Sequence, residues 1–479
     1  MTTTTHTGEM EPLHGAFDEL DAKITAGMEA CAIPGAAVAV WAGGKEYVKG
    51  YGVTNIDHPS PVDGDTVFRI GSTTKTFTGT AMMRLVDQAK VDLDAPVRRY
   101  ITDFAVADPA ASAAVTVRQL LNHTSGWLGD DIQDFGRGDD ALARYVTAMT
   151  RLPQLTTPGT VFAYNNAGLV AAGRIIELVT GSTYESAMES LLLGPLQLGH
   201  THYFSDQIIG LNVAASHNVV DGKPVVDTGF WALPRSCNPT GGLMSSARDQ
   251  LRYARFHIGD GRAPTGNRLL SQQALVDMRS DPGAGGTLQV DLTGMGVTWM
   301  LRPSAEDVTI VQHGGTWSGQ HSGFFIVPER NFAMTVLTNS EGGTHLINEL
   351  FGGDWALRRF ASISNLPTTP QHLAAVALAP YEGRYIAQHV DQSGNAGEAI
   401  IEFRIGDGQL DGTMSAPDIT GNNPDSESGS RLGLAFYRPD YGLDLGPDDK
   451  PVGTRSDFVR GPDGAIAWFR NHGRLYRRQ

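Results

Sequence analysis

Predicted strands lie at both ends of roughly the first 360 residues of this chain, and helical patterns fill the stretch between them. Residues 34–41 and 45–52 read as two strands around a Gly-Gly turn. Further strands are predicted late, over residues 295–301, 309–312, 323–327 and 332–338. The strongest helix between them runs from Asn166 to Thr180 and stops at Gly181. We therefore expect an α/β (α+β) domain in which both ends build one sheet and a helical subdomain lies beside it.

A change of pattern after residue 363 predicts a second domain. Residues 364–371 contain Pro367 and Pro370 and are expected to form a linker. Short strand patterns separated by turns then follow, over residues 383–387, 399–405, 432–437, 457–460, 465–470 and 473–477. Such a run is typical of a small antiparallel barrel. The expected division is a first domain over residues 15–363, a linker over 364–371 and a β-barrel domain over 372–479.

The composition excludes several classes of partner. Of the 479 residues, 41 % are hydrophobic and 19 % are charged, as in water-soluble globular proteins. The formal net charge of −15 argues against nucleic acids and anionic membranes, because both need basic surfaces. The histidines form no metal-ligand spacing, so we expect no metal and no cofactor. Cys31 and Cys237 lie far apart and are expected to be free, buried thiols.

The N-terminal residues lack the apolar region that a secretory signal needs, and no run of residues is long enough to span a bilayer. We therefore expect a cytoplasmic protein, with a signal removed beforehand as the alternative. The sequence leaves the oligomeric state open, a homo-oligomer included.

The segment Ser72-Thr73-Thr74-Lys75 places a hydroxyl three residues before an amine, at the predicted start of a helix. Residues three apart lie on one helix face, so Ser72 Oγ and Lys75 Nζ can meet. A serine needs a base to become a nucleophile, and a buried lysine can serve because burial lowers its pKa. Alone, such a tetrapeptide is more often a solvated helix face, so its weight depends on the motifs that follow.

Two later motifs support a catalytic site. Tyr164 and Asn166 stand at the predicted start of a helix and bring a phenol and an amide. On its own, Tyr164 would be read as a packed core tyrosine. The segment His313-Gly314-Gly315-Thr316 ends a predicted strand in two glycines, where a backbone can approach a ligand and offer an N–H.

In this order, the three motifs resemble those of the serine β-lactamase/penicillin-binding-protein superfamily, most closely its class C-like branch, peptidase family S12. That branch contains class C β-lactamases, DD-peptidases, family VIII esterases and D-aminopeptidases. Other segments that fit its pattern are Leu120–Gly126, Pro158-Gly159, Gly194–Leu198, Thr240–Ser246 and Gly323–Pro328. The resemblance implies a β-lactamase/transpeptidase-like fold, with an antiparallel sheet, a helical subdomain and the site at their junction. The C-terminal part resembles the lipocalin-like barrels that follow some S12 domains.

The resemblance also implies a role for each motif residue. Ser72 would be the nucleophile that forms an acyl-enzyme, Lys75 its base or electrostatic partner, and Tyr164 the group that passes a proton to the leaving group. Asn166 would hydrogen-bond the lysine and the substrate. The backbone N–H groups of Ser72 and Thr316 would form the oxyanion hole. Whether Lys75 or Tyr164 is the acylation base stays open, because coupled groups share their titration.

His313 departs from the pattern of class C β-lactamases and DD-peptidases, which have Lys-Thr-Gly at this place. A histidine is mostly neutral near pH 7 and would donate one hydrogen bond. The departure weakens the resemblance for β-lactams and for peptides with a free carboxylate, and it favours esters, lactones, amides and D-amino-acid derivatives. We expect His313 to act in catalysis and Gly314 and Gly315 to bind the substrate; packing at a strand end is the alternative for His313.

Trp127, Trp231 and Trp317 lie beside the motif segments and are expected to form an apolar wall for a bulky acyl group, although core packing explains each equally well. The sequence thus predicts a serine hydrolase that acts on a small-molecule carboxylic ester or lactone through an acyl-enzyme. The alternatives are a D-stereospecific aminopeptidase or amidase, a class C-like β-lactamase, and a non-catalytic binder of peptides or cell-wall fragments.

Overall fold

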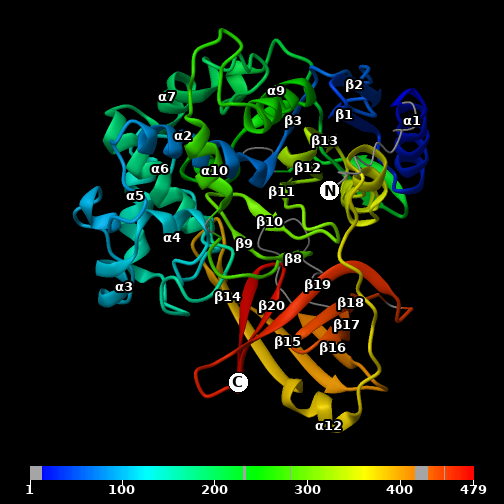
Figure 1. Cartoon of the computed structure of the whole chain (residues 1–479). Coiled ribbons are helices and arrows are strands. Elements are labelled where there is room, and N and C mark those ends of the chain that lie inside the picture. Colours follow the sequence, from blue (N-terminus) through cyan, green and yellow to red (C-terminus); the bar gives the residue numbers. More distant parts are fainter. Residues whose placement is uncertain (1–12, 230–232, 281, 416–429, 447) are drawn as a thin grey trace, which may run out of the picture.

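The computed structural model describes residues 13–229, 233–280, 282–415, 430–446 and 448–479. Its centre is a seven-stranded antiparallel sheet (Figure 1). From one edge to the other, the strands are β2 (Lys45–Gly52), β1 (Gly35–Ala42), β13 (Phe332–Thr338), β12 (Gln320–Val327), β11 (Ile310–Trp317), β10 (Met300–Arg302) and β9 (Gly294–Met295). β1 pairs with β13, with Val38 opposite Val336. The prediction that both ends of this part build one sheet is confirmed.

Helices cover both faces of this sheet, and β1 shows how its sequence permits that. Successive side chains of a strand point to opposite faces. Val38 and Val40 belong to the core cluster of α1 (Leu13–Ala30), whereas Ala37 and Ala39 belong to the cluster of α9 (Ala247–Ile258). An almost continuous apolar run is therefore needed at β1, since neither of its faces meets solvent.

The helical subdomain is organised around α2 (Thr74–Asp87) and α6 (Asn166–Thr180), which pack against each other. The predicted helix over 166–180 is confirmed with its bounds: Asn165 caps its start by accepting from Gly168 N at 2.8 Å, and Gly181 ends it at φ 70°. The other helices are α3 (Pro109–Ala114), α4 (Val117–Leu121), α5 (Ala141–Ala148), α7 (Tyr184–Met188), α8 (Asn238–Gly241) and α10 (Gln272–Ser280). Among the described residues, none of the helices combines the length and the apolar character needed to cross a bilayer.

Two predicted elements differ from the structure. The strand expected over residues 295–301 is a hairpin of β9 and β10, because Thr298 adopts φ 62° and the chain reverses there. The single helix expected near residues 344–360 is broken into α11 (Gly343–Ile347) and two π-helical turns, over 348–352 and 357–361. Gly352 and Gly353 stand at the break and favour it, since glycine is a weak helix former.

Short strand pairs complete the first part of the chain: β3 (Val67–Arg69) with β6 (Met244–Ser246), β4 (His217–Val220) with β5 (Lys223–Val226), and β7 (Gly286–Thr287) with β8 (Asp291–Leu292). Strand β3 ends just before the turn that leads into α2.

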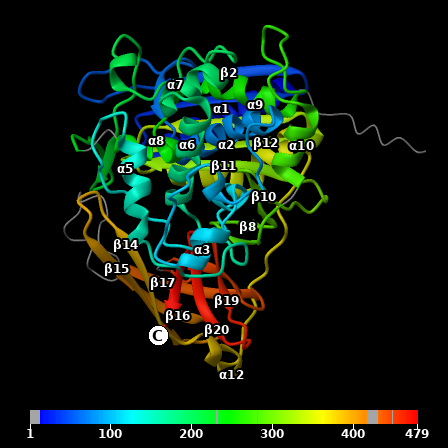
Figure 2. The ribbon, with the colours of Figure 1, turned by 90° about the vertical axis from the view of Figure 1, so that its left-hand side faces the viewer.

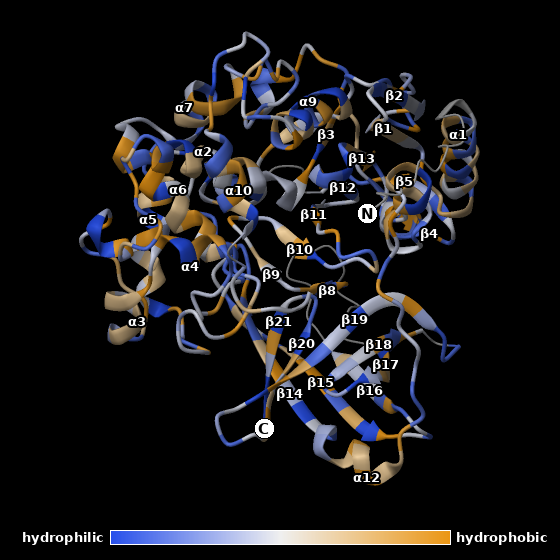
Figure 3. Ribbon diagram, in the orientation of Figure 1, coloured by the Kyte–Doolittle hydropathy of each residue, from blue (hydrophilic) through white to orange (hydrophobic). Residues whose placement is uncertain are grey.

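The C-terminal part is a closed antiparallel barrel of eight strands, as expected. Its strands are β14 (Gly383–Val390), β15 (Ala396–Ile405), β16 (Leu410–Ser415), β17 (Ser430–Arg438), β18 (Tyr441–Leu445), β19 (Pro451–Arg460), β20 (Ile466–Asn471) and β21 (Arg474–Arg478), preceded by α12 (Ala375–Leu378). Along β15, Ala399, Ile401 and Phe403 are buried and alternate with more exposed residues, so apolar and polar colours alternate on the barrel strands (Figure 3). The domain boundaries themselves stay a prediction.

The barrel contacts the first part of the chain on the side of β8 and β10 (Figures 1 and 2). Val390 of β14 forms two backbone hydrogen bonds there, from its N–H to Asp130 O at 2.9 Å and from Ile132 N–H to its own O at 3.2 Å. Arg470 of β20 donates to Phe162 O at 2.7 Å. The barrel thus contacts both the loop between α4 and α5 and the segment that leads to α6.

Candidate active site

Ser72 and Lys75 meet at the start of α2. Ser72 lies in a 3-10 turn (Gly71–Thr73) that runs directly into the helix, so both residues share its first turn. Lys75 Nζ lies 3.0 Å from Ser72 Oγ and donates to Thr240 O at 2.7 Å. Burial holds the pKa of Lys75 well below its usual range, and the charge of Arg474 lowers it further. A neutral amine at hydrogen-bond distance can accept the serine proton.

Tyr164 is the second polar side chain beside Ser72. Burial raises the pKa of Tyr164 to about 12, while its hydrogen bond with Ser72 acts in the opposite direction. Lys75 Nζ stands 5.0 Å from the centre of the tyrosine ring. The phenol is therefore protonated near neutral pH, and hydroxyl, amine and phenol form one continuous proton-transfer group.

Asn166 does not make the expected contact with Lys75. Its Nδ2 donates instead to Asp130 Oδ1 at 2.9 Å, and Thr240 O takes the place of the amide at the lysine. The expected hydrogen bond was what the resemblance to the family implied for this position. It is redirected here because a carboxylate from a distant loop lies within reach of the amide.

Two glycines bring β11 against the nucleophile turn. A Cβ atom on Gly315 would lie 1.9 Å from Ile70 O and 2.7 Å from Ser72 N. A Cβ on Gly71, which has φ 49°, would lie 2.6 Å from Thr316 N. The N–H groups of Ser72 and Thr316 are thus neighbours, the arrangement that a two-donor oxyanion hole requires. We expected the two glycines to end the strand. Instead, β11 continues through them to Trp317.

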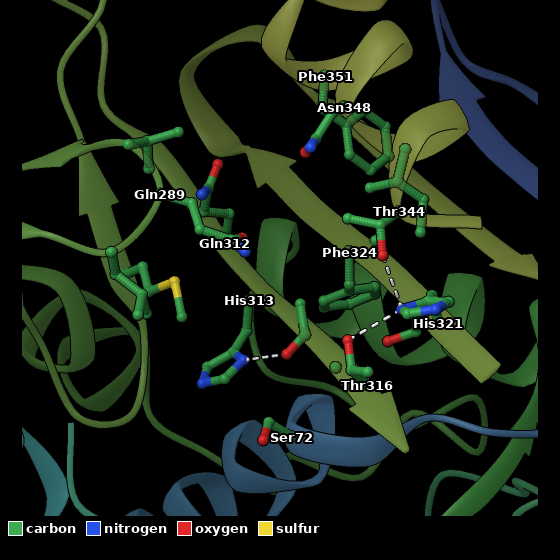
Figure 4. Close-up of a pocket in the computed structure, with 18 of the residues that line it drawn as sticks. Ser72, Gln289, Gln312, His313, Thr316, His321, Phe324, Thr344, Asn348 and Phe351 are labelled. Atoms are coloured by element: carbon green, nitrogen blue, oxygen red, sulfur yellow. Dashed lines mark hydrogen bonds between the residues drawn. The ribbon is translucent and has the colours of Figure 1, made fainter. Parts of the chain in front are cut away.

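His313 is buried on β11 and has one free ring nitrogen. Its Nδ1 lies 2.6 Å from Gly314 O and so carries the proton, and its Nε2 has no hydrogen-bond partner among the described residues (Figure 4). Burial lowers the pKa of His313 to about 3, and Lys75 contributes to the shift. The ring is neutral and its Nε2 can only accept a hydrogen bond, whereas the sequence suggested a donor.

The barrel supplies a residue that the sequence did not reveal. Arg474 of β21 forms a bidentate ion pair with Asp130, with Nε–Oδ2 at 2.8 Å and Nη2–Oδ1 at 3.2 Å. Its guanidinium lies 4.8 Å from the centre of the Tyr164 ring. Although burial acts to raise it, the pKa of Asp130 is held low by Arg474. No sequence signal marks Arg474, because its position follows only from how the barrel docks.

A second network that the sequence did not reveal supports Thr316. Its Oγ1 lies 3.0 Å from His321 Nδ1, and the same nitrogen lies 3.0 Å from Thr344 Oγ1 (Figure 4). Burial lowers the pKa of His321 to about 4. The network connects β11 to α11 and fixes the strand that carries the second backbone donor.

These groups border a cavity of about 540 Å³. Ser72, Tyr164, His313, Gly314, Gly315 and Thr316 line it, together with His472 and Arg474 from the barrel. Phe324, Phe325 and Phe351 also line it, whereas Trp127 and Trp317 do not.

The predicted tryptophan wall is not found. Trp127 is fully buried against Phe104 in the core and does not line the cavity. Trp317 lies past the cavity, at the end of β11 where the strand turns into β12. Trp231 lies outside the described residues.

Several known proteins are similar to this chain in sequence or in fold. Residues 20–351 match the family model described as Beta-lactamase. The chain is 35 % identical over 358 residues to Penicillin-binding protein 4 of Amycolatopsis lactamdurans, a match that covers 74 % of this chain and 93 % of that protein. The crystal structure of SurE with D-Leu superposes with a TM-score of 0.72 at 25 % identity, over 97 % of this chain and 100 % of that one. A class C β-lactamase superposes with a TM-score of 0.58 at 22 % identity, over 73 % of this chain and 98 % of the other.

Proposed function

The chain belongs to the Beta-lactamase family, and from this premise we propose that it is a serine hydrolase that cleaves a carboxylic ester or lactone through an acyl-enzyme. The observation that carries the proposal is the contact of 3.0 Å between Nζ of the buried Lys75 and Oγ of Ser72. A serine beside an amine whose pKa is lowered by burial is an activated nucleophile.

In the proposed reaction, Ser72 Oγ attacks the substrate carbonyl carbon while its proton passes to the Lys75 amine, either directly or through the Tyr164 phenol, which gives its own proton to the lysine as it takes that of the serine. The negative charge that develops on the carbonyl oxygen is held by the N–H groups of Ser72 and Thr316. The tetrahedral intermediate collapses to an acyl-serine, and the leaving alcohol takes the proton. Water then attacks the acyl-serine with the same groups acting in reverse, which releases the acid and restores the serine.

The preference for a neutral ester depends on His313. A lysine at this place would offer a positive charge to a carboxylate near the scissile bond, whereas the neutral imidazole offers only the lone pair of Nε2. That lone pair favours a substrate with a donor, such as a hydroxyl or an amide N–H, beside the reacting carbonyl.

A panel of three substrate types tests the proposal: nitrophenyl esters, D- and L-aminoacyl anilides, and a chromogenic cephalosporin. We expect ester hydrolysis to dominate and to disappear in Ser72→Ala. A fluorophosphonate should label the peptide that contains Ser72. Labelling elsewhere, or full activity in Ser72→Ala, would overturn the assignment. Dominant cephalosporin hydrolysis would support the β-lactamase alternative. Tight binding without turnover would support the non-catalytic alternative.

A D-stereospecific amidase or peptidase is the second candidate, and one observation favours it. The SurE structure, which holds D-Leu, aligns over the barrel as well as the catalytic part of this chain. A D-configured acyl group is therefore a reasonable substrate feature for this chain too. This function would be supported if the protein hydrolysed D-aminoacyl anilides faster than both their L-isomers and the esters of the panel.

A further inference from the structure

The cavity continues beyond the catalytic groups along one face of β10, β11 and β12. Side chains that stand opposite each other across antiparallel strands share a face. Gln312 stands opposite Met300 on one side and Phe325 on the other, and Arg302 is the next residue of β10 on that face. All four line the cavity. Seen from Ser72, Gln312 lies beyond His313 on β11 (Figure 4).

Arg302 is a buried cation without an acidic partner in this part of the cavity. It is only 4 % exposed. Within the described parts of the chain, the only hydrogen bond of its guanidinium is a long one, 3.5 Å from Nη1 to Gln312 Oε1, and no carboxylate lies within ion-pair distance. Burial lowers the pKa of Arg302 to about 10, so the group is still charged at neutral pH.

The nearest carboxylates are already engaged by other arginines. Asp291 pairs with Arg455 at 2.6 Å and with Arg438 at 3.3 Å. Asp354 pairs with Arg358 at 3.2 Å. A buried charge without a counter-ion is costly, and an anionic ligand would remove that cost.

We propose that Arg302 and Gln312 form an anion subsite that binds a carboxylate at the far end of the substrate's acyl chain. A guanidinium binds a carboxylate through two parallel hydrogen bonds, and Gln312 Nε2 can donate a third, since only its Oε1 is engaged with Arg302. The inference deepens the proposed function and rests on it, because it assigns the acyl chain to this branch of the cavity.

The geometry also sets the length of that chain. Gln312 and Thr316 are four residues apart on β11, which corresponds to about 13 Å along an extended strand. An extended chain of about ten single bonds spans such a distance, and the reach of the arginine side chain shortens it somewhat. Met300, Phe325 and Phe351 line the path and suit methylene groups. The preferred substrate class is thus an ester of a medium-chain dicarboxylic acid with one free carboxylate.

A matched substrate series tests the subsite. Nitrophenyl esters of succinic, adipic, suberic and sebacic acid, each with the far carboxyl free or as its methyl ester, are compared by kcat/KM. In the unaltered protein we expect the free-acid form to be preferred for the longer chains and not for succinate. In Arg302→Met this preference should fall about tenfold to hundredfold, the usual range for charge-assisted hydrogen bonds.

Arg302→Lys keeps the charge but loses the bidentate geometry, so it should retain part of the preference. Arg404→Gln removes an exposed arginine of the barrel and should leave the preference unchanged. If the unaltered protein has a higher kcat/KM for the methyl-ester form than for the free-acid form at every chain length, the subsite is wrong. The proposed ester hydrolysis would still stand. That comparison needs no variant, so it decides the question even where Arg302→Met does not fold.

A binding measurement separates the subsite from the proposed chemistry. Free suberate is titrated by calorimetry into Ser72→Ala and into Ser72→Ala with Arg302→Met. Binding that is at least tenfold weaker in the double variant supports the subsite even if no ester is turned over, which would refute only the proposed function. Equal binding to both proteins, or none to Ser72→Ala, would overturn the subsite.

Discussion

At the scale of single residues, Ser72, Lys75 and Tyr164 form one proton-transfer group, and groups that act as a unit give non-additive losses when removed. We expect Lys75→Ala and Tyr164→Phe each to lower kcat about a hundredfold or more. The double variant should be little worse than the weaker single one, because each change already breaks the same transfer. Rates of acyl-enzyme formation measured in single turnovers give the comparison. Losses that multiply would mean that the two residues act in separate steps.

The serine–lysine contact could be predicted because it is local: three residues of helix fix it. The Asn166 contact could not, since it depends on Asp130, which comes from another loop and is held in turn by the barrel. The protonation of His313 could not be predicted either. Its tautomer follows from the carbonyl of Gly314, and its low pKa follows from burial, neither of which a residue type reveals.

His313 makes the stability of the fold depend on pH. Its pKa is about 3 in the folded protein, against an ordinary value of 6.5, so between these values the unfolded chain binds a proton that the folded protein does not. The free energy of unfolding should therefore fall as the pH drops from 6.5 towards 3, by about 1.4 kcal/mol per pH unit for this proton. His313→Gln should reduce that slope in denaturant titrations between pH 4 and 6.5. His321→Gln should also reduce this slope, but less, because the pKa of His321 is about 4 and so lies closer to the ordinary value. Slopes that match the unaltered protein would contradict the buried neutral rings.

At the scale of elements, the close approach of β11 to the turn before α2 decides whether the oxyanion hole exists. Gly315→Ala would place a Cβ 1.9 Å from Ile70 O, so strand and turn must separate. We expect kcat to fall about a hundredfold to a thousandfold, as when an oxyanion-hole donor is lost. Gly314→Ala is the matched change, because its nearest contact is 3.3 Å, to Ser322 O, and its loss should be much smaller. Equal losses in the two variants would show that the approach of the strand is not what matters.

The sequence predicted elements well where one signal dominated. The cap at Asn165 and the glycine after Thr180 fixed both ends of α6. The prediction was poor where the backbone conformation of single residues determined where an element ends. The positive φ of Thr298 divides a predicted strand into two, and β11 continues through the glycines that were expected to end it. In the barrel, β16 and β18 went unpredicted because Leu410–Ser415 and Tyr441–Leu445 each contain a glycine and an aspartate, which are uncommon in strands.

At the scale of the whole molecule, the barrel forms part of the candidate active site. Tyr164 N donates to Gly473 O at 2.8 Å, and Arg474 crosses from β21 to Asp130. The presence of a barrel could be predicted from its run of short strands, but its contribution to the site could not, because no local pattern records how two folded parts dock. A barrel that only flanked the cleft would affect substrate selectivity alone. Here the barrel also places the positive charge of Arg474 beside Asp130 and the Tyr164 ring.

That charge leads to a prediction about the pH dependence of catalysis. Arg474 lowers the pKa values of both Lys75 and Tyr164, and Asp130 raises both. Catalysis needs a neutral lysine and a protonated tyrosine, so the pH profile of kcat/KM should rise with the first pKa and fall with the second. Arg474→Gln removes the lowering charge, so both limbs should move to higher pH. Asp130→Asn removes the raising charge, so both limbs should move to lower pH.

The double variant separates this effect from damage to the fold. With both charges removed, the two displacements should largely cancel and the profile should return towards that of the unaltered protein, even if the rate stays low. A loss of rate with no displacement of the limbs would mean that the ion pair only holds the barrel in place. Displacements of the same sign in both single variants would contradict the electrostatic role as well, because a purely structural disturbance has no reason to distinguish the two charges.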